Sequence, residues 1–286
     1  MAGAPNAEQR DYWNGDDSRE WIEHPTRFDE MLAPIGALVL EHARLAVGMR
    51  VLDVGCGNGA MTIDAAEQVA PDGTVVGIDL SEGMLKVARG RASDLGVGNV
   101  AFVAADAQVA DLRGPHDAIV SRFGIMFFDD PDAAFSNLAR SLAPNGRIAF
   151  ACWAPMLENE WVATPVAAMI EAIGPPSELP PPDQPGPFRY AEPAALIASL
   201  EGAGLREVAV ERVDVPVLLG GRGSLDDACS FIATSGMTRA LLGDAAPEDR
   251  ERALVAIRAS LEPLVTDDGV RVGSSTWIVT AHSGGR

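Results

Sequence analysis

The sequence has few of the residues that bind metals, form disulfides or attract nucleic acids. It contains three cysteines and four histidines. Cys56, Cys152 and Cys229 lie far apart, without the spacing of a disulfide framework or a metal site. Lys86 is the sole lysine, and 41 acidic residues against 22 basic ones give a net charge of −19. Such a surface repels phosphate backbones, so we expect reduced thiols, no metal and no nucleic-acid partner.

Long apolar runs are also missing. No stretch reaches the roughly 20 apolar residues that a membrane-spanning helix needs. The first ten residues lack the apolar core of a secretion signal. We therefore expect a cytoplasmic protein without a membrane span. The 286 residues suffice for one large domain or for a domain with a sizeable insertion.

A glycine turn is the central feature of the sequence. The apolar run Val51 to Val54 contains an acidic residue, and Gly55, Gly57 and Gly59 follow it, before a segment with helical spacing of its apolar residues. A strand, a glycine turn and a helix open a doubly wound α/β sheet. Glycine lets the backbone turn sharply and approach a ligand, and the next helix presents free N–H groups to an anionic group.

Two cofactor classes fit this turn. Read as Gly55-x-Gly57-x-x-Ala60, it fits the dinucleotide fingerprint of NAD(P)-dependent oxidoreductases. Read as Asp53-x-Gly55-x-Gly57-x-Gly59, it resembles the first motif of the class I S-adenosylmethionine (SAM) methyltransferases. Asp53 favours the second interpretation, because its carboxylate would repel a pyrophosphate and attract the α-ammonium group of SAM.

Further features follow in the order that this resemblance implies. Thr74 to Asp79 is a predicted strand whose last residue would accept both ribose hydroxyls. Asp106 follows the next strand, and in these methyltransferases the acidic residue here accepts a hydrogen bond from the adenine amine. Ser81 and Asp130 are predicted helix N-caps. The resemblance thus implies a cofactor site made of Asp53, Gly55, Cys56, Gly57, Gly59, Asp79, Leu80, Asp106, Ala107, Arg122 and Phe123.

Arg122 and an aromatic N-terminal stretch leave alternatives open. Arg122 would bind the carboxylate of SAM or an acid of the substrate, or form a salt bridge with Asp129 or Asp130. Trp21, His24 and Phe28 share one face if their segment is helical. That stripe would pack in the core or belong to a mobile lid over SAM and substrate. Separate helices are predicted to begin at Pro25 and near Pro34.

The predicted fold is α/β, with a doubly wound, mostly parallel, seven-stranded Rossmann-like sheet, an antiparallel last strand and a helical cap insertion. Valines after Arg206 change parity between Val210 and Val213, which indicates a bulge. Two helices are predicted in the cap. The expected domains are an N-terminal helical lid at 1–46 that begins with a loose tail at 1–10, a SAM-binding core at 47–153, a proline-rich insertion at 154–190, the rest of the sheet at 191–223 and 266–286, and the cap at 224–265.

The chain is most similar to the small-molecule branch that includes ubiquinone and menaquinone C-methyltransferases. This resemblance covers about residues 45–153 and implies methyl transfer from SAM, which depends mainly on proximity and orientation. We expect a lipophilic small-molecule acceptor methylated on oxygen or carbon. Methylation of a small amine, an NAD(P)-dependent oxidoreductase and a non-catalytic SAM-binding partner protein remain alternative functions. A homodimer is a possible oligomeric state. A base is needed only for some acceptors, and His24 is the first candidate. The predicted substrate pocket comprises Trp13, Trp21, Met126, Phe127, Trp153 and Trp161.

Overall fold

One mixed sheet organises the molecule. The computed structural model describes residues 4–175, 184–243 and 245–284, so the middle of the predicted proline-rich insertion lies outside the described residues. The strand order is β3-β2-β1-β4-β5-β8-β6, and a short strand, β7, pairs only with β8. The strands are β1 Arg50–Val54, β2 Thr74–Asp79, β3 Val100–Ala104, β4 His116–Arg122, β5 Leu142–Trp153, β6 Arg206–Leu218, β7 Val265–Thr266 and β8 Gly269–His282.

Strands β1 to β5 are parallel, whereas β8 runs antiparallel to both β5 and β6. The predicted doubly wound sheet with an antiparallel last strand is therefore confirmed. β1 lies in the middle, and Val51 pairs with Val75 of β2 and Ala118 of β4. Val51, Leu52 and Val54 are all buried. A short continuous apolar run is what a parallel strand covered on both faces requires.

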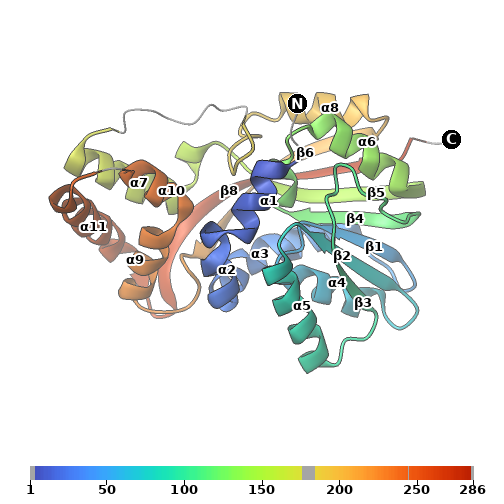
Figure 1. The fold of residues 1–286 in the computed structure, drawn as a ribbon, viewed down its shortest axis with the longest axis horizontal. Helices are drawn as coiled ribbons and strands as arrows, with labels where there is room; N and C mark the ends of the chain where they lie inside the picture. Colours follow the sequence, from blue (N-terminus) through green and yellow to red (C-terminus); the bar gives the residue numbers. More distant parts are fainter. Residues whose placement is uncertain (1–3, 176–183, 244, 285–286) are drawn as a thin grey trace.

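Helices cover both faces of this sheet. α3, α4 and α5 lie on one face, and α6 and α8 lie on the other (Figure 1). The described helices are α1 Ala7–Asn14, α2 Arg19–Glu23, α3 Pro25–Ala43, α4 Ala60–Val69, α5 Glu82–Leu95, α6 Pro131–Ser141, α7 Glu160–Ile173, α8 Ala194–Gly202, α9 Leu225–Thr234, α10 Gly236–Leu242 and α11 Pro247–Leu261. Among them, none combines the length and the apolar character that crossing a membrane would require. The Ser81 and Asp130 side chains cap α5 and α6, as predicted.

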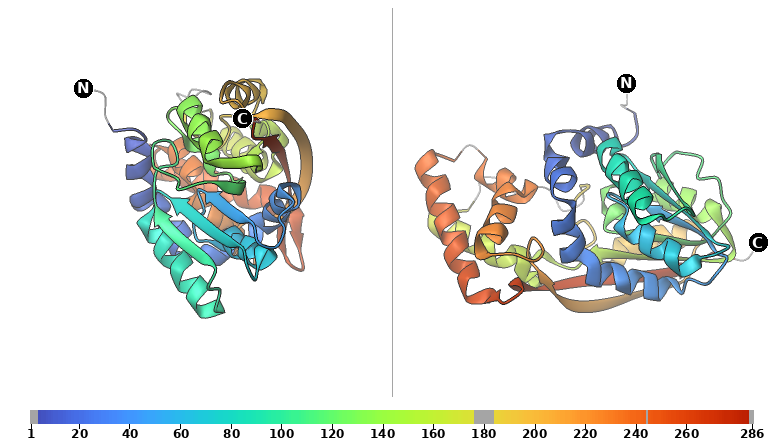
Figure 2. Two further views of the ribbon diagram at one scale, coloured as in Figure 1. Left: turned by 90° about the vertical axis from the view of Figure 1, so that its right-hand side faces the viewer. Right: turned by 90° about the horizontal axis from the view of Figure 1, so that it is seen from below.

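The antiparallel strands reach far beyond the parallel ones. β6 and β8 extend to one end of the molecule, where α7, α9, α10 and α11 gather (Figure 1). α7 packs against α11 and β8, so a helix from the predicted insertion joins the cap. The N-terminal helices α1 and α2 lie between the cap and the parallel strands, and α3 continues along the face of the sheet (Figure 2).

Two helix predictions are wrong. α3 runs from Pro25 to Ala43 without a break, and Pro34 lies inside it. Its buried face, which includes Ile35 and Val39, packs against the sheet. That burial outweighs the hydrogen bond that the proline removes. The cap contains three α-helices among its described residues instead of two, because the Ser235 side chain caps a separate short helix, α10.

The predicted bulge and loose tail are also wrong. The β6 ladder with β8 is continuous from Ala209 to Leu218, and its register shift lies nearer the start of the strand, between Arg206 and Ala209. Val208 and Val210 are half-buried on one face of β6, whereas Val213, Val215 and Val217 are half-buried or buried on the other face. The change occurs where β5 ends beside β8. The tail is ordered from Ala7 onward as α1, and Asn6 is 2% exposed.

Candidate active site

The glycine turn joins β1 to α4 at the carboxyl edge of the parallel strands. Gly55, Gly57 and Gly59 have φ values of 67°, 52° and 80°, which favour glycine. A Cβ atom on Gly55 would lie 2.7 Å from Cα of Gly124, and one on Gly59 would lie 2.8 Å from Cβ of Ala88. A Cβ atom on Gly57 would make only an ordinary van der Waals contact. Packing therefore requires two of the glycines, whereas the third has space beside it.

Asp79 links the end of β2 to this turn. Its carboxylate accepts the N–H groups of Gly57 and Ser81, each at 2.8 Å. Burial raises the pKa of Asp79, and the backbone donors oppose that rise. Each carboxylate oxygen has a second lone pair for a further donor. The residue expected to hold the ribose thus lies directly against the glycine turn.

Asp53 is a buried carboxylate with one unsatisfied oxygen. It is 1% exposed, and its Oδ2 atom accepts the Thr62 hydroxyl at 2.7 Å. Its Oδ1 atom has no hydrogen-bond partner among the described residues. Burial raises the pKa of Asp53 to about 7, while Thr62 and Arg122 lower it. A buried acceptor without a donor is costly, so the site favours a ligand that carries a positive charge.

Asp106 also has one carboxylate oxygen without a hydrogen-bond donor. It is 5% exposed, and its Oδ1 atom accepts the Asn6 amide at 2.7 Å and the Gln108 N–H at 2.9 Å. Its Oδ2 atom is buried without a hydrogen bond to any described residue. The nearest cation, the exposed Arg10 guanidinium, is 4.0 Å from Oδ2. A donor such as an adenine amine would satisfy this oxygen.

Unsatisfied acceptors are concentrated at this edge. Seven buried side-chain polar atoms in the described ranges lack a hydrogen-bond partner. Four of them belong to the carboxyl edge or to the helix docked on it: Gln9 Oε1, Asp53 Oδ1, Asn58 Oδ1 and Asp106 Oδ2. All four are oxygens that accept hydrogen bonds. SAM offers an ammonium group, two ribose hydroxyls and an adenine amine, so its donors fit this set of acceptors.

Arg122 ends β4 beside the same turn. Its Nη1 atom would lie 3.3 Å from a Cβ atom placed on Gly36 of α3. Burial lowers the pKa of Arg122, whereas the carboxylates of Asp29, Asp53 and Asp64 raise it. Within the described part of the chain its guanidinium makes no salt bridge. The site therefore combines a cation and an anion, Arg122 and Asp53, as a zwitterionic amino-acid group requires.

The alternative salt bridge between Arg122 and the next loop does not form. Asp129 instead accepts the N–H of Asn6 at 2.6 Å, and Asp130 caps α6 by accepting the N–H of Ala133 at 3.0 Å. Both carboxylates are thus committed to backbone donors. Neither carboxylate therefore pairs with the Arg122 guanidinium at the edge of the sheet.

The N-terminal helices α1 and α2 are fixed across this edge by three asparagines. Asn6 contacts the loops after β3 and β4, Asn14 contacts the loop after β2, and Asn58 extends from the glycine turn to α2. The bonds are Asn6 to Asp106 and Asp129, Asn14 to the carbonyl of Leu80 at 2.9 Å and the N–H of Glu82 at 3.2 Å, and Asn58 to the carbonyl of Trp21 at 2.7 Å.

The aromatic residues of the predicted substrate pocket form two groups. Trp13 has its ring 5.2 Å from Phe127 and 6.1 Å from Trp21. Trp153 is 5.0 Å from Trp161, and it also stacks on Phe123 at 4.0 Å. Met126, by contrast, is 1% exposed and belongs to the core. One group joins the N-terminal helices to the loop after β4, and the other joins the ends of β4 and β5 to α7.

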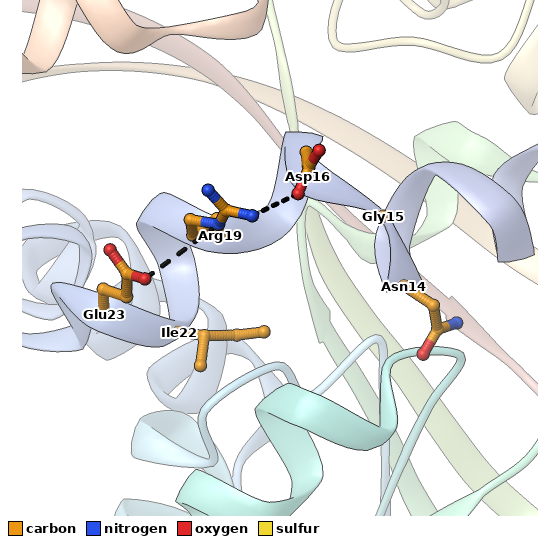
Figure 3. A pocket seen from close by; sticks show the side chains of 6 residues that line it. All are labelled: Asn14, Gly15, Asp16, Arg19, Ile22 and Glu23. Atoms are coloured by element: carbon orange, nitrogen blue, oxygen red, sulfur yellow. Dashed lines mark hydrogen bonds and ion pairs between the residues drawn. The ribbon is translucent and has the colours of Figure 1, made fainter.

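A surface hollow lies at the junction of α1 and α2. It is lined by Asn14, Gly15, Asp16, Arg19, Ile22 and Glu23 (Figure 3). Arg19 forms ion pairs with both Asp16 and Glu23, so the charged side chains of the hollow are paired with one another. His24, the candidate base, is exposed between α2 and α3. Within the described ranges, no cluster of three or more His, Cys, Asp or Glu side chains suits a metal ion.

Comparisons with known proteins agree with this geometry. The family model described as a methyltransferase domain matches residues 45–171. The chain is 34% identical over 189 residues to nocamycin O-methyltransferase of Saccharothrix syringae, and the match covers 63% of this chain and 67% of that protein. The chain belongs to the SAM-dependent methyltransferase family. Its cofactor is therefore SAM.

A second relative matches a shorter part of the chain. The ubiquinone/menaquinone biosynthesis C-methyltransferase UbiE of Pseudomonas fluorescens is 39% identical over 111 residues, which are 38% of this chain and 43% of that protein. The chain thus spans about two thirds of the first relative and less than half of the second. Among solved structures, phosphoethanolamine N-methyltransferase 2 of Haemonchus contortus has a TM-score of 0.58 at 17% identity, covering 96% of this chain and 59% of that one. That likeness shows the fold.

Sequence reasoning did not find several polar residues of this edge. Asn6 and Gln9 lie in the stretch expected to be loose. Asn6 is buried by contacts with Asp106 and Asp129, which lie 100 and 123 residues away along the chain. Thr62 supports Asp53 from the next helix, and no motif marks it. Asn58 lies inside the glycine turn, so its position alone could have suggested it.

Proposed function

We propose that this SAM-dependent methyltransferase methylates an oxygen or carbon atom of a small lipophilic metabolite. The named activities of the two relatives, one an O-methyltransferase and one a C-methyltransferase, support this proposal. The two aromatic groups beside the glycine turn support a lipophilic acceptor, because aromatic side chains bind apolar, planar molecules well. The concentration of unsatisfied acceptors at the carboxyl edge is the observation that carries the proposal.

Each polar residue of the edge has a proposed binding role. Asp79 would hold the ribose, Asp106 the adenine amine and Asp53 the α-ammonium group, while Arg122 would bind the carboxylate of the methionine part. Bound SAM supplies a methyl group attached to a positively charged sulfur. After the methyl group is transferred, the sulfur is part of a neutral thioether. The remaining proposed contacts are made by the backbone and side chains of Gly55, Cys56, Gly57, Gly59, Leu80, Ala107 and Phe123.

The N-terminal helices have the proposed role of excluding water. They cover the carboxyl edge and carry Trp13 and Trp21 toward the aromatic side of the site. Excluding water strengthens the electrostatic interactions beneath them and keeps the acceptor in place. His24 is the proposed base for acceptors that must lose a proton. Because the His24 side chain is exposed, the structure supports the covering role of Trp13 and Trp21 better than it supports His24 as the base.

Calorimetric titration tests the cofactor assignment. We expect S-adenosylhomocysteine (SAH), the demethylated product, to bind with micromolar affinity and NADH not to bind. Binding of NADH without SAH would contradict the proposed site. The Gly57→Glu variant provides the matched control, because Gly57 has space for a side chain but lies where the ligand is proposed.

Transfer of a labelled methyl group from SAM to a panel of small molecules tests the acceptor. Phenols, enols and polycyclic hydroxyl compounds are the expected acceptors. A small amine is the second candidate, since the net charge of −19 favours cations. Methylation of amines alone would contradict O- or C-transfer, and no turnover with any compound would favour a non-catalytic SAM-binding protein. A cytoplasmic location, a homodimer and the absence of nucleic-acid binding remain predictions.

A further inference from the structure

Asn6 is the most completely bonded residue of the N-terminal segment. Its amide nitrogen donates to Oδ1 of Asp106 at 2.7 Å, and its amide oxygen accepts the N–H of Asp129 at 2.7 Å. Its own N–H donates to the Asp129 carboxylate at 2.6 Å. The residue is 2% exposed. One side chain therefore joins the loops that follow β3 and β4 to the start of α1.

The backbone at Asn6 is suited to this position. Its φ of 52° and ψ of 27° are left-handed, a conformation that asparagine and glycine adopt more readily than other residues. It lies at the N-cap position of α1 without a side-chain capping bond. The amide is therefore not used to stabilise the helix and is directed to Asp106 and Asp129.

The Asn6 amide also determines how Asp106 is presented. Oδ1 is occupied by two donors, from Asn6 and from the N–H of Gln108, whereas Oδ2 is buried without a hydrogen bond to a described residue. Two donors on one oxygen hold the plane of the carboxylate and leave the other oxygen as the acceptor. Arg10 remains 4.0 Å from that oxygen and is itself exposed.

We propose that Asn6 is a positioning residue of the adenine subsite, which fixes Asp106 so that only an amino-purine satisfies Oδ2. This inference rests on the proposed function, because it assigns Asp106 to the adenine amine. A purine with a keto oxygen would place an acceptor against the carboxylate, and two facing acceptors repel each other. The N-terminal helix thereby contributes to the choice of nucleoside as well as covering the site.

The experiment compares two asparagines at the two ends of α1. Asn6→Gly removes the amide and keeps a residue that tolerates the left-handed backbone. Asn14→Ala is the matched control, since Asn14 also ties α1 to the carboxyl edge but bonds only Leu80 and Glu82 there. Calorimetry measures the affinity of the full chain for SAH and for S-inosylhomocysteine, whose purine carries a keto oxygen in place of the amine.

We expect the unmodified chain to bind SAH at least about tenfold more tightly than the inosyl compound, as one charge-assisted hydrogen bond implies. In Asn6→Gly this ratio should fall to about threefold or less, because the carboxylate can rotate. Asn14→Ala should weaken both ligands together and keep the ratio. Deletion of residues 1–6 removes the same amide by another route and should give the same fall, should the glycine variant not fold.

An unchanged ratio in Asn6→Gly, with SAH binding intact in the unmodified chain, would overturn the inference and leave the proposed function standing. An equal fall in Asn14→Ala would also overturn it, because the ratio would then depend on docking of α1 in general. Failure of the unmodified chain to bind SAH would overturn the proposed function itself, and the inference with it.

Discussion

The two ends of the sheet are built on different principles. The parallel strands end in loops whose polar side chains bond to backbone groups. Asp79, for example, accepts the N–H of Ser81 two residues later and the N–H of Gly57 in the turn after the neighbouring strand. The antiparallel end consists of long strands and packed helices, and α7, which begins at Glu160, meets α11, which begins at Pro247. The first end carries the proposed binding site, whereas the second consists mainly of packed strands and helices.

The relatives differ at the same boundary. The family model covers the parallel strands and ends inside α7 at residue 171, so it does not reach the helices between β6 and β8. A loop that approaches a ligand tolerates few substitutions, whereas a packed helix tolerates exchange of one apolar residue for another. The comparison therefore predicts that changes at the parallel end affect the cofactor and changes in the cap affect the acceptor.

The largest effect should come from a close backbone contact of the glycine turn at the parallel end. In Gly55→Ala the new Cβ atom would lie 2.7 Å from Cα of Gly124, at a φ of 67°. We expect a loss of about 3 kcal/mol or more in the free energy of unfolding, since backbone cannot move aside easily. Gly57→Ala should lose only about 1 kcal/mol, the cost of its φ. Denaturant unfolding measures both, and equal losses would contradict the packing account of Gly55.

The next effect tests whether the cofactor depends on the parallel end alone. Asp79→Ala should weaken SAH binding by about 1–3 kcal/mol, because charge-assisted hydrogen bonds to the ribose are lost. Phe231→Ala, in cap helix α9, is the control and should leave that affinity within about twofold. Calorimetry measures both variants. Unchanged affinity in Asp79→Ala would mean that other residues hold the ribose, and equal losses in both variants would remove the division between the two ends.

A third effect follows from the buried carboxylate of Asp53. Its pKa is raised to about 7, so below this pH the group holds a proton that an ammonium ligand must displace. SAH affinity should therefore rise about tenfold from pH 6 to pH 8, following the ionised fraction. Without ligand the sign is opposite: the raised pKa makes the folded chain lose stability as pH increases from about 4 to 7.

Asp53→Asn provides the control for this pH dependence. The amide has nearly the same shape but does not ionise in this range, so its SAH affinity should be weaker and nearly constant between pH 6 and pH 8. Calorimetry at several pH values measures both chains. A slope that persists in Asp53→Asn would assign the titration to another group.

The smallest effect belongs to the cap end. Trp161→Phe removes an indole N–H that donates to Oδ1 of Asn159 at 3.1 Å. We expect a loss of about 1 kcal/mol in unfolding free energy and an SAH affinity within about twofold of the unmodified chain. With an acceptor identified, its KM should rise while the SAH affinity stays constant. A large fall in SAH affinity would place Trp161 in the cofactor site and weaken the comparison.

The sequence predicted what depends on neighbours along the chain. The glycine turn, the acidic end of β2 and the caps Ser81 and Asp130 are short local patterns with a direct physical cause, and the fold class follows from their order. Asn6 could not be found in this way, because its partners lie 100 and 123 residues away. Pro34 was misjudged for the same reason, since the packing of α3 on the sheet is a long-range effect. The roles of the site residues remain predictions.

The two sides that flank the proposed substrate space are attached to the sheet in unequal ways. The cap is carried on β6 and β8, whose backbones pair at ten successive positions from Ala209 to Leu218. Because the two paired strands move together, displacing the cap requires both strands to bend as one unit. α1 and α2 are fastened mainly by a few amide side chains and ring contacts. Molecules would therefore enter and leave on the N-terminal side, while the paired strands β6 and β8 hold the cap in place on the other side.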